Sequence, residues 1–307
     1  MGIFQSLFGG AKKEAPHKAV PYDPELARRM AGEVVEEMTE PVVRFTLERG
    51  EAGIFESKVG GTPYLPRDMA WPVDSRGVGM ELLAQVDCAA LAGLPDFPHT
   101  GLLQFFTALD DVYGIDFDDQ VAQTGFRVLY HDTVDPCVTQ EEVLAKKAPQ
   151  PVEDREYDTP LLAKARMVFS APETQHISEA DYQAWGEFLR RWNEVHPGAG
   201  LKNAWEFYHS LPEDESWEIF PETEDKGPHH QLGGYPYFTQ EDPRGGREPA
   251  YTDLNVLLFQ LDSDMHTRDK GGDLVMWGDC GVANFFISRE ALKRRDFSRV
   301  CYNWDCC

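Results

Sequence analysis

The first regular pattern of apolar residues along the chain lies between residues 23 and 38 and repeats at every fourth position. The residues that carry it are Leu26, Met30, Val34 and Met38. Apolar residues at this spacing form one face of an α-helix. Asp23 is suited to the N-cap and Pro24 to the first helical position, so the pattern predicts a helix that begins there. We expect Pro41 to stop this helix and a strand to run from Val42 to Leu47.

A second helix is predicted from Glu179 to Val195, where large apolar residues again share one helical face. Its apolar stripe consists of Tyr182, Trp185, Phe188, Leu189, Trp192 and Val195. Ser178 can cap this helix, with Asp181 three residues later in the manner of a capping box. A stripe so rich in aromatic residues is typical of a helix that packs against a sheet.

Three short blocks of sequence occur twice in the same order, which indicates an internal duplication. The first copies span residues 60–64, 82–87 and 101–106, and the second copies span residues 233–237, 257–262 and 281–286. The offset between the copies changes only from 173 to 175 and then to 180 residues. We interpret the blocks as two copies of a β unit of about 50 residues.

Within each copy, apolar and polar residues alternate as they do in half-buried strands. One face is expected to carry Leu82, Ala84 and Val86, matched in the second copy by Leu257, Phe259 and Leu261. The two copies also share amide residues, which are Gln85 and Gln104 in the first and Gln260 and Asn284 in the second. We expect two similar sheets that pack about a pseudo-two-fold axis. The aromatic residues buried between them would be Phe105, Phe106, Phe285 and Phe286.

These patterns predict an α+β fold, mainly antiparallel β, in which a duplicated β unit is flanked by helices. Residues 1–22 are expected to be a flexible leader and linker, and residues 23–307 a single domain. The first repeat spans about residues 55–107 and the second about residues 230–290, with an acidic insertion between them at about 108–229.

Several blocks resemble the YwqG-like family, and the resemblance extends from about residue 40 to the C-terminus. The blocks that carry it are residues 57–61, 82–87, 101–106, 230–244, 257–264, 277–279 and 302–307. The resemblance implies a bacterial, cytosolic protein of unknown biochemical function, with an α+β fold on a duplicated β core. It also implies an association with immunity or stress proteins. It provides no catalytic residues that could be carried over to this chain.

Composition and charge exclude several classes of protein. The 307 residues include 53 acidic and 29 basic ones, and the net charge of −24 repels nucleic acid. Six cysteines are too few for a disulfide scaffold, and no apolar run is long enough to span a membrane. The apolar tip Ile3, Phe4, Leu7 and Phe8 precedes Lys12 and Lys13, which is the reverse of a secretory signal. We expect a cytoplasmic protein without stable membrane insertion, whose tip is either a flexible leader or a weak docking element for a membrane or a partner.

The negative charge is concentrated in the predicted insertion. Residues 107–160 carry a net charge of −9 and residues 206–226 a net charge of −7. The densest group of carboxylates consists of Asp110, Asp111, Asp116, Asp118 and Asp119. This group can attract a basic protein partner, wrap a hard cation such as Ca²⁺, or serve as a solvated turn. A weaker cation candidate is the acidic segment from Asp262 to Asp273.

A second set of residues suggests a ligand pocket between the two β units. Its members are Lys58, Arg67, Gln85, His230, Arg244 and Gln260. Lys58 and His230 occupy nearly equivalent places before the two Gly-Gly turns, where a cation can meet an anionic ligand. The alternative is that the basic residues pair with carboxylates of their own sheet and that the amides tie the strands to the turns.

The sequence contains no recognisable catalytic motif and predicts no catalytic residue, metal or cofactor. A nucleophile elbow, a Walker loop and a zinc-protease helix are all absent. His229 and His230, or Cys280 with Cys301 and Cys306, are the residues closest to a metal-ligand pattern. Packing histidines and free thiols are the alternative interpretation.

Two hypotheses about function follow. In the first, the chain is a cytosolic protein-binding module whose acidic surface engages a basic partner such as an effector or toxin. In the second, it is a small-ligand-binding protein or enzyme with a pocket between the duplicated β units.

Overall fold

The structure is a computed structural model that describes residues 22–148, 159–212, 218–221, 229–245, 250–264 and 272–307. The helices are α1 (Pro24–Glu37), the 3-10 helix η1 (Cys88–Leu91), α2 (Gln140–Leu144), α3 (Tyr182–Val195), α4 (Ala204–Ser210) and α5 (Arg289–Arg294). The first strands are β1 (Thr39–Arg49), β2 (Lys58–Val59), β3 (Glu81–Asp87), β4 (Leu102–Thr107) and β5 (Phe126–His131). The later strands are β6 (Ala165–Phe169), β7 (Glu173–His176), β8 (Gln231–Gly233), β9 (Val256–Asp262), β10 (Val282–Ile287) and β11 (Cys301–Asp305). The predicted leader lies outside the described residues, except for Tyr22.

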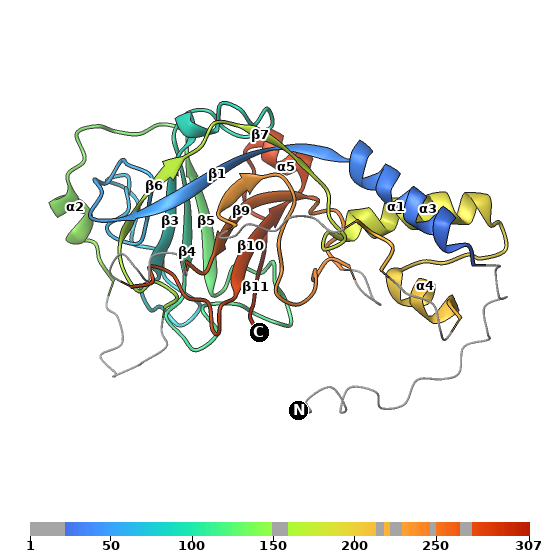
Figure 1. Ribbon diagram of the computed structural model, residues 1–307. Helices are drawn as coiled ribbons and strands as arrows, with labels where there is room; N and C mark the ends of the chain where they lie inside the picture. The colour runs from blue at the N-terminus through green and yellow to red at the C-terminus, as the bar shows by residue number, and fades with distance from the viewer. Residues whose placement is uncertain (1–21, 149–158, 213–217, 222–228, 246–249, 265–271) are drawn as a thin grey trace.

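The strands form one antiparallel sheet in the order β11-β10-β9-β8-β1-β6-β2-β3-β4-β5, and β7 pairs with the start of β1. The long strand β1 lies at the centre, where it pairs with β8 and with β6. Figure 1 shows that the sheet curls until it is a nearly closed barrel. The prediction of two separate sheets was wrong, because β1 and β6 join the two halves into one continuous ladder.

Aromatic side chains fill the inside of the barrel and bring its two halves into contact. The ring of Phe105 on β4 stacks on Phe259 of β9 with centroids 4.5 Å apart, and lies 4.9 Å from Phe285 of β10. The two ends of the sheet meet where Phe126 of β5 contacts Tyr302 of β11, at 5.2 Å. The backbone N–H of Tyr302 also donates to the carbonyl of Gln120, in the loop before β5. Side chains and this loop therefore close the barrel between β5 and β11.

Matching irregularities in two strand pairs change the predicted faces. The register shifts between Leu82 and Ala84 in the β3–β4 pair, and between Phe285 and Phe286 in the β9–β10 pair. The shift places Leu82 in one outer cluster and Leu257 in another, although Ala84 and Phe259 belong to the central core. Phe106 and Phe286 lie in the same outer clusters because each directly follows a core phenylalanine, and successive strand residues point to opposite faces. The prediction that Leu82 shares a face with Ala84 was therefore wrong, as was the matching prediction for Leu257. Phe106 and Phe286 are buried, but not between the two halves.

The helices α1, α3 and α4 form a second layer beyond one end of the barrel (Figure 1). The helix α1 begins as predicted, with the Asp23 carboxylate accepting from two backbone N–H groups of its first turn. It ends at Glu37, before Pro41, which lies inside β1. The helix α3 begins at Tyr182 and is capped by Asp181 instead of Ser178, because the Asp181 carboxylate accepts from the N–H of Gln183.

The aromatic stripe of α3 packs mainly within this helical layer. Phe188 and Trp192 lie beside Phe207 of α4, and Tyr22 closes the cluster at 6.2 Å from Trp192 and from Phe207. The predicted packing of this stripe on a sheet was wrong, because α1 and α4 cover it instead. None of the described helices combines the length and apolar character needed to cross a bilayer.

Candidate functional site

A row of polar side chains crosses each half of the sheet at the same register. In one half, Lys58 of β2 pairs with Gln85 of β3, which pairs with Gln104 of β4. In the other half, the row runs through Gln231 of β8, Gln260 of β9, Asn284 of β10 and Asn303 of β11. Each row also begins at an arginine, Arg166 of β6 beside Lys58 and Arg44 of β1 beside Gln231. These rows contain three of the six predicted ligand residues.

In the first half, two buried amides hold the turn that follows Gly60-Gly61. Gln85 Oε1 accepts from the N–H of Tyr64 at 2.9 Å, and its Nε2 donates to the carbonyl of Ile54 at 2.8 Å. Gln104 Nε2 donates to the carbonyl of Tyr64 at 2.7 Å. His131 lies beside Gln104 Oε1 at 2.9 Å, and burial lowers the pKa of this histidine. The amides therefore tie the strands to the turn.

The second half repeats these hydrogen bonds at equivalent positions. Gln260 Oε1 accepts from the N–H of Tyr237 at 2.8 Å, and its Nε2 donates to the carbonyl of His229 at 2.6 Å. Asn284 Nδ2 donates to the carbonyl of Tyr237 at 3.0 Å. Because buried amides must be hydrogen-bonded, these contacts favour the interpretation that they fix the Gly-Gly turns.

Lys58 and His230 lie in different surroundings. The Lys58 side chain is 1% exposed, its Nζ donates to the carbonyl of Gly53 at 2.5 Å, and burial lowers its pKa to about 8. The strand register pairs Lys58 with Gln85 and Gln231 with Gln260, so the equivalent of Lys58 is Gln231 instead of His230. His230 stacks on Phe45 with centroids 5.3 Å apart, and its Nδ1 accepts from the backbone N–H of Asp262.

The two predicted arginines are both paired with carboxylates. Arg67 is half-exposed and pairs with Asp135 and Glu142. The hydrogen bond to Glu142 raises the pKa of Arg67. Arg244 is fully buried and pairs with Asp181 at 3.1 Å and Asp242 at 2.8 Å.

Arg244 is also enclosed by two aromatic rings. Its guanidinium lies 3.7 Å from the ring centroid of Phe286 and 4.8 Å from that of Tyr182. Burial by itself lowers the pKa of Arg244, but the two carboxylates raise it overall. The structure therefore does not gather the six predicted residues around one cavity.

The predicted acidic group lies on the loop between β4 and β5, and part of it shapes that loop. Asp110 Oδ1 accepts from the N–H of Gly114 at 2.8 Å, and Asp116 Oδ1 accepts from the N–H of Asp118 at 3.0 Å. Asp119 accepts from the N–H of Val121 at 3.3 Å. The side chains of Asp111 and Asp118 are left exposed to solvent.

Two side chains of strand β11 donate hydrogen bonds to backbone carbonyls of this loop. Trp304 Nε1 donates to the carbonyl of Val112 at 2.8 Å, and the Tyr302 hydroxyl donates to the carbonyl of Tyr113 at 3.0 Å. Gly114 has a φ of 78°, and a Cβ there would collide with the carbonyl of Gly125. The carboxylates are therefore presented by a loop with a defined conformation.

A hollow of about 420 Å³ lies beside one end of this loop, and one of about 370 Å³ lies beneath its acidic part. The acidic hollow is lined by Asp74, Arg76, Asp110, Asp116, Phe117 and Asp118, among others. The carboxylates outnumber the single arginine, which pairs with Asp74 at 2.6 Å and with Asp110 at 3.7 Å. Hydrogen bonds from the N–H of Val78 and from Arg76 keep the pKa of Asp74 low, although burial alone raises it.

The charged and aromatic residues of the acidic hollow that sequence reasoning missed are Asp74, Arg76 and Phe117. Phe117 is 68% exposed. It stands between Asp116 and Asp118 in the sequence, and an apolar residue within such an acidic segment could have drawn attention to it. Asp74 comes from a distant loop, so only folding could reveal it. Where the structure describes the chain, no three His, Cys, Asp or Glu side chains are arranged to hold a metal ion. The acidic segment after Asp264 lies mostly outside the described residues.

Residues 57–306 match the family described as Domain of unknown function (DUF1963). No curated protein matches the chain.

Proposed function

The chain belongs to the DUF1963 family, and we propose that it is a protein-binding module whose acidic loop receives a basic partner. The observation that carries this proposal is the acidic hollow with an exposed aromatic ring at its rim. Asp74, Asp110, Asp116 and Asp118 surround a space of about 370 Å³, and Phe117 beside them is 68% exposed. A lysine or arginine side chain fits the charge of the hollow, and an apolar neighbour can cover the ring.

The geometry of the loop supports binding instead of simple solubility. Solvated charges need no fixed backbone, yet three carboxylates of this loop accept backbone hydrogen bonds and two side chains of β11 bond its carbonyls. A surface that is ordered before it meets its partner loses less conformational entropy on binding. The negative charge of the chain as a whole would speed the approach of a basic protein and make binding sensitive to salt.

We also propose that the two halves of the barrel arose by duplication, as in the YwqG-like pattern. Three features support this: the matching polar rows, the matching register shifts, and the paired Gly-Gly turns. The two halves would also exchange a strand. Strand β1, at the start of the chain, pairs with β8 of the second half, while the later strand β6 pairs with β2 of the first half. We also propose a cytoplasmic location, because the cysteines that the structure describes form no disulfide bond with one another.

The binding proposal can be tested with peptides displayed on phage and selected on the immobilised full chain. We expect selected peptides to be enriched in Lys and Arg beside an apolar residue, and their retention to fall as salt increases. The variant Asp111→Asn, Phe117→Ser, Asp118→Asn should lose this enrichment. It keeps the carboxylates of Asp110 and Asp116 that shape the loop, so its thermal stability should be unchanged.

A matched control changes the same amount of charge elsewhere. Glu33→Gln with Glu36→Gln on α1 removes two negative charges far from the loop. This control should select the same basic peptides as the unmodified chain. Equal enrichment by the loop variant, or selection of peptides without excess positive charge, would overturn the proposal.

A further inference from the structure

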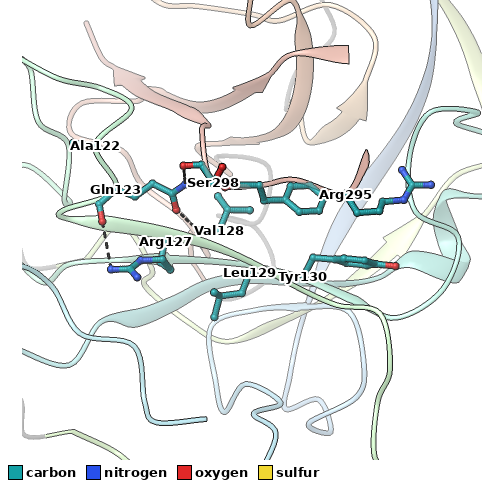
Figure 2. A pocket seen from close by; sticks show the side chains of 9 residues that line it. Ala122, Gln123, Arg127, Val128, Leu129, Tyr130, Arg295 and Ser298 are labelled. Carbon is teal, nitrogen blue, oxygen red and sulfur yellow. Dashed lines mark hydrogen bonds between the residues drawn. The ribbon is translucent and has the colours of Figure 1, made fainter. Parts of the chain in front are cut away.

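We propose that the hollow beside the closure of the barrel between β5 and β11 binds a small organic anion. This anion would carry a carboxylate or phosphate group attached to an aromatic ring. The hollow of about 420 Å³ lies between strand β5 and the segment that joins α5 to β11 (Figure 2). Its lining includes Gln123, Arg127, Val128, Tyr130, Arg295 and Phe297. Its volume is within the range of small-molecule sites.

The charge of this hollow is opposite to that of the protein. The chain carries a net charge of −24, yet both charged residues that line the hollow are arginines. In the part of the chain that the structure describes, neither Arg127 nor Arg295 forms a salt bridge with a carboxylate. Arg67, Arg244 and Arg289, in contrast, each pair with two carboxylates. The hollow therefore presents positive charge that the protein itself does not neutralise.

Of the two arginines in the hollow, Arg127 has the greater unused capacity to donate hydrogen bonds. Among the described residues, its Nε is buried without a hydrogen-bond partner, and only its Nη2 donates, to the carbonyl of Gln123 at 3.5 Å. A buried donor without a partner is costly, and an anion would satisfy it. The planar guanidinium suits the two oxygens of a carboxylate or phosphate. Arg295 lies at the other end of the hollow, where its guanidinium donates to the carbonyls of Asp96, Phe97 and Leu292.

Aromatic residues also line this hollow. The rings of Tyr130 and Phe297 lie 5.6 Å apart, and Val128 lies beside them (Figure 2). Gln123 fixes this wall, because its Oε1 accepts from the N–H of Val128 at 3.0 Å while its Nε2 donates to the carbonyl of Phe297 at 2.8 Å. Gln123 also holds a φ of 49°, a conformation that non-glycine residues rarely adopt. An aromatic body would therefore lie along a preformed surface.

The same side chain explains why a small ligand is favoured over an added peptide strand. Strand β5 is at the end of the sheet and pairs only with β4 in the described part of the chain. An added strand would need the N–H of Val128, which the Gln123 side chain already occupies.

The test is a ligand-detected NMR titration of the full chain with phenyl phosphate, benzoate, inorganic phosphate and benzyl alcohol. We expect phenyl phosphate or benzoate to bind with a Kd of about 1 mM or tighter, and the tighter of the two identifies the preferred anionic group. Inorganic phosphate and neutral benzyl alcohol should each bind at least about fivefold more weakly, since phosphate lacks the aromatic ring and benzyl alcohol lacks the anionic group. The Nε–Hε signal of Arg127 should shift with the same Kd.

Two variants locate the site. Arg127→Gln should weaken binding at least about fivefold, whereas Arg28→Gln, which removes an exposed charge on α1, should leave it unchanged. If Arg127→Gln does not fold, Arg127→Lys can be used instead. It keeps the positive charge but lacks the planar guanidinium that can donate two parallel hydrogen bonds, so it should also weaken binding. Undiminished binding by the folded Arg127 variant, or equal binding of inorganic phosphate or benzyl alcohol, would overturn the proposal.

Discussion

The buried ion pair at Arg244 offers the sharpest test of how this fold is held together. Arg244 is fully buried and connects the segment after β8 to the start of α3, through Asp242 and Asp181. Replacing it with Met removes the guanidinium, which lies over the Phe286 ring, and leaves an unbranched apolar side chain in the same space. The two carboxylates would then be buried without their counter-charge. We expect the free energy of unfolding to fall by about 3–5 kcal/mol.

The pH dependence of this loss has a defined sign. Burial raises the pKa of Asp181, and Arg244 counteracts that rise. In the Arg244→Met variant the pKa of Asp181 should rise further above its value in the unfolded chain. A carboxyl whose pKa is raised in the folded state costs stability once the pH is high enough to ionise it. The loss should therefore be largest at pH 8 and smaller at pH 5, where protonation of Asp181 relieves it.

The assay is urea unfolding of both proteins at pH 5 and pH 8, followed by tryptophan fluorescence. Arg299→Met is the matched control, because Arg299 pairs with Asp253 on the surface with both side chains about half-exposed. That variant should lose less than about 1 kcal/mol at either pH. A loss at Arg244 as small as that at Arg299, or one that is larger at pH 5 than at pH 8, would refute the reasoning.

Three further predictions concern single residues. Gly101→Ala should reduce the free energy of unfolding by more than about 3 kcal/mol, because the new Cβ would collide with a backbone carbonyl of β5. Gly77→Ala has the same positive φ but open space around it, so thermal unfolding should report only about 1 kcal/mol of loss. Because burial lowers the pKa of Lys58 to about 8, the stability of the unmodified protein should gain about 3 kcal/mol relative to Lys58→Met between pH 8 and pH 10.5. A difference that stays flat in urea titrations over this range would contradict it. Gln260→Leu leaves two partly buried backbone groups unpaired and should cost about 2–4 kcal/mol, and a neutral result in the same assay would show that water replaces the amide.

Local sequence determined the elements whose signals are contained in a few neighbouring residues. Asp23 and Pro24 predict the start of α1 correctly, because an N-cap and its helix are adjacent in the chain. The alternation of β3 and β9 predicts strands at the right places, and the repeated blocks identify the equivalent amides Gln85 and Gln260. The start of α3 was misplaced because Ser178 and Asp181 are both good caps, and local sequence does not choose between them.

Only the tertiary structure decided how these elements combine. The pairing of β1 with β8 joins residues almost 190 positions apart, and no local pattern specifies such a contact. The register shifts that move Leu82 and Leu257 to the outer face depend on the neighbouring strand, which the alternation of one strand does not contain.

Both hollows beside the loop before β5 have the same origin. Asp74 reaches the acidic hollow from one distant segment, and Arg295 reaches the basic hollow from another. The sequence by itself determined the composition of each strand and the excess of negative charge. Which charges lie side by side was decided by long-range packing, because opposite ends of the sheet meet only when the barrel closes.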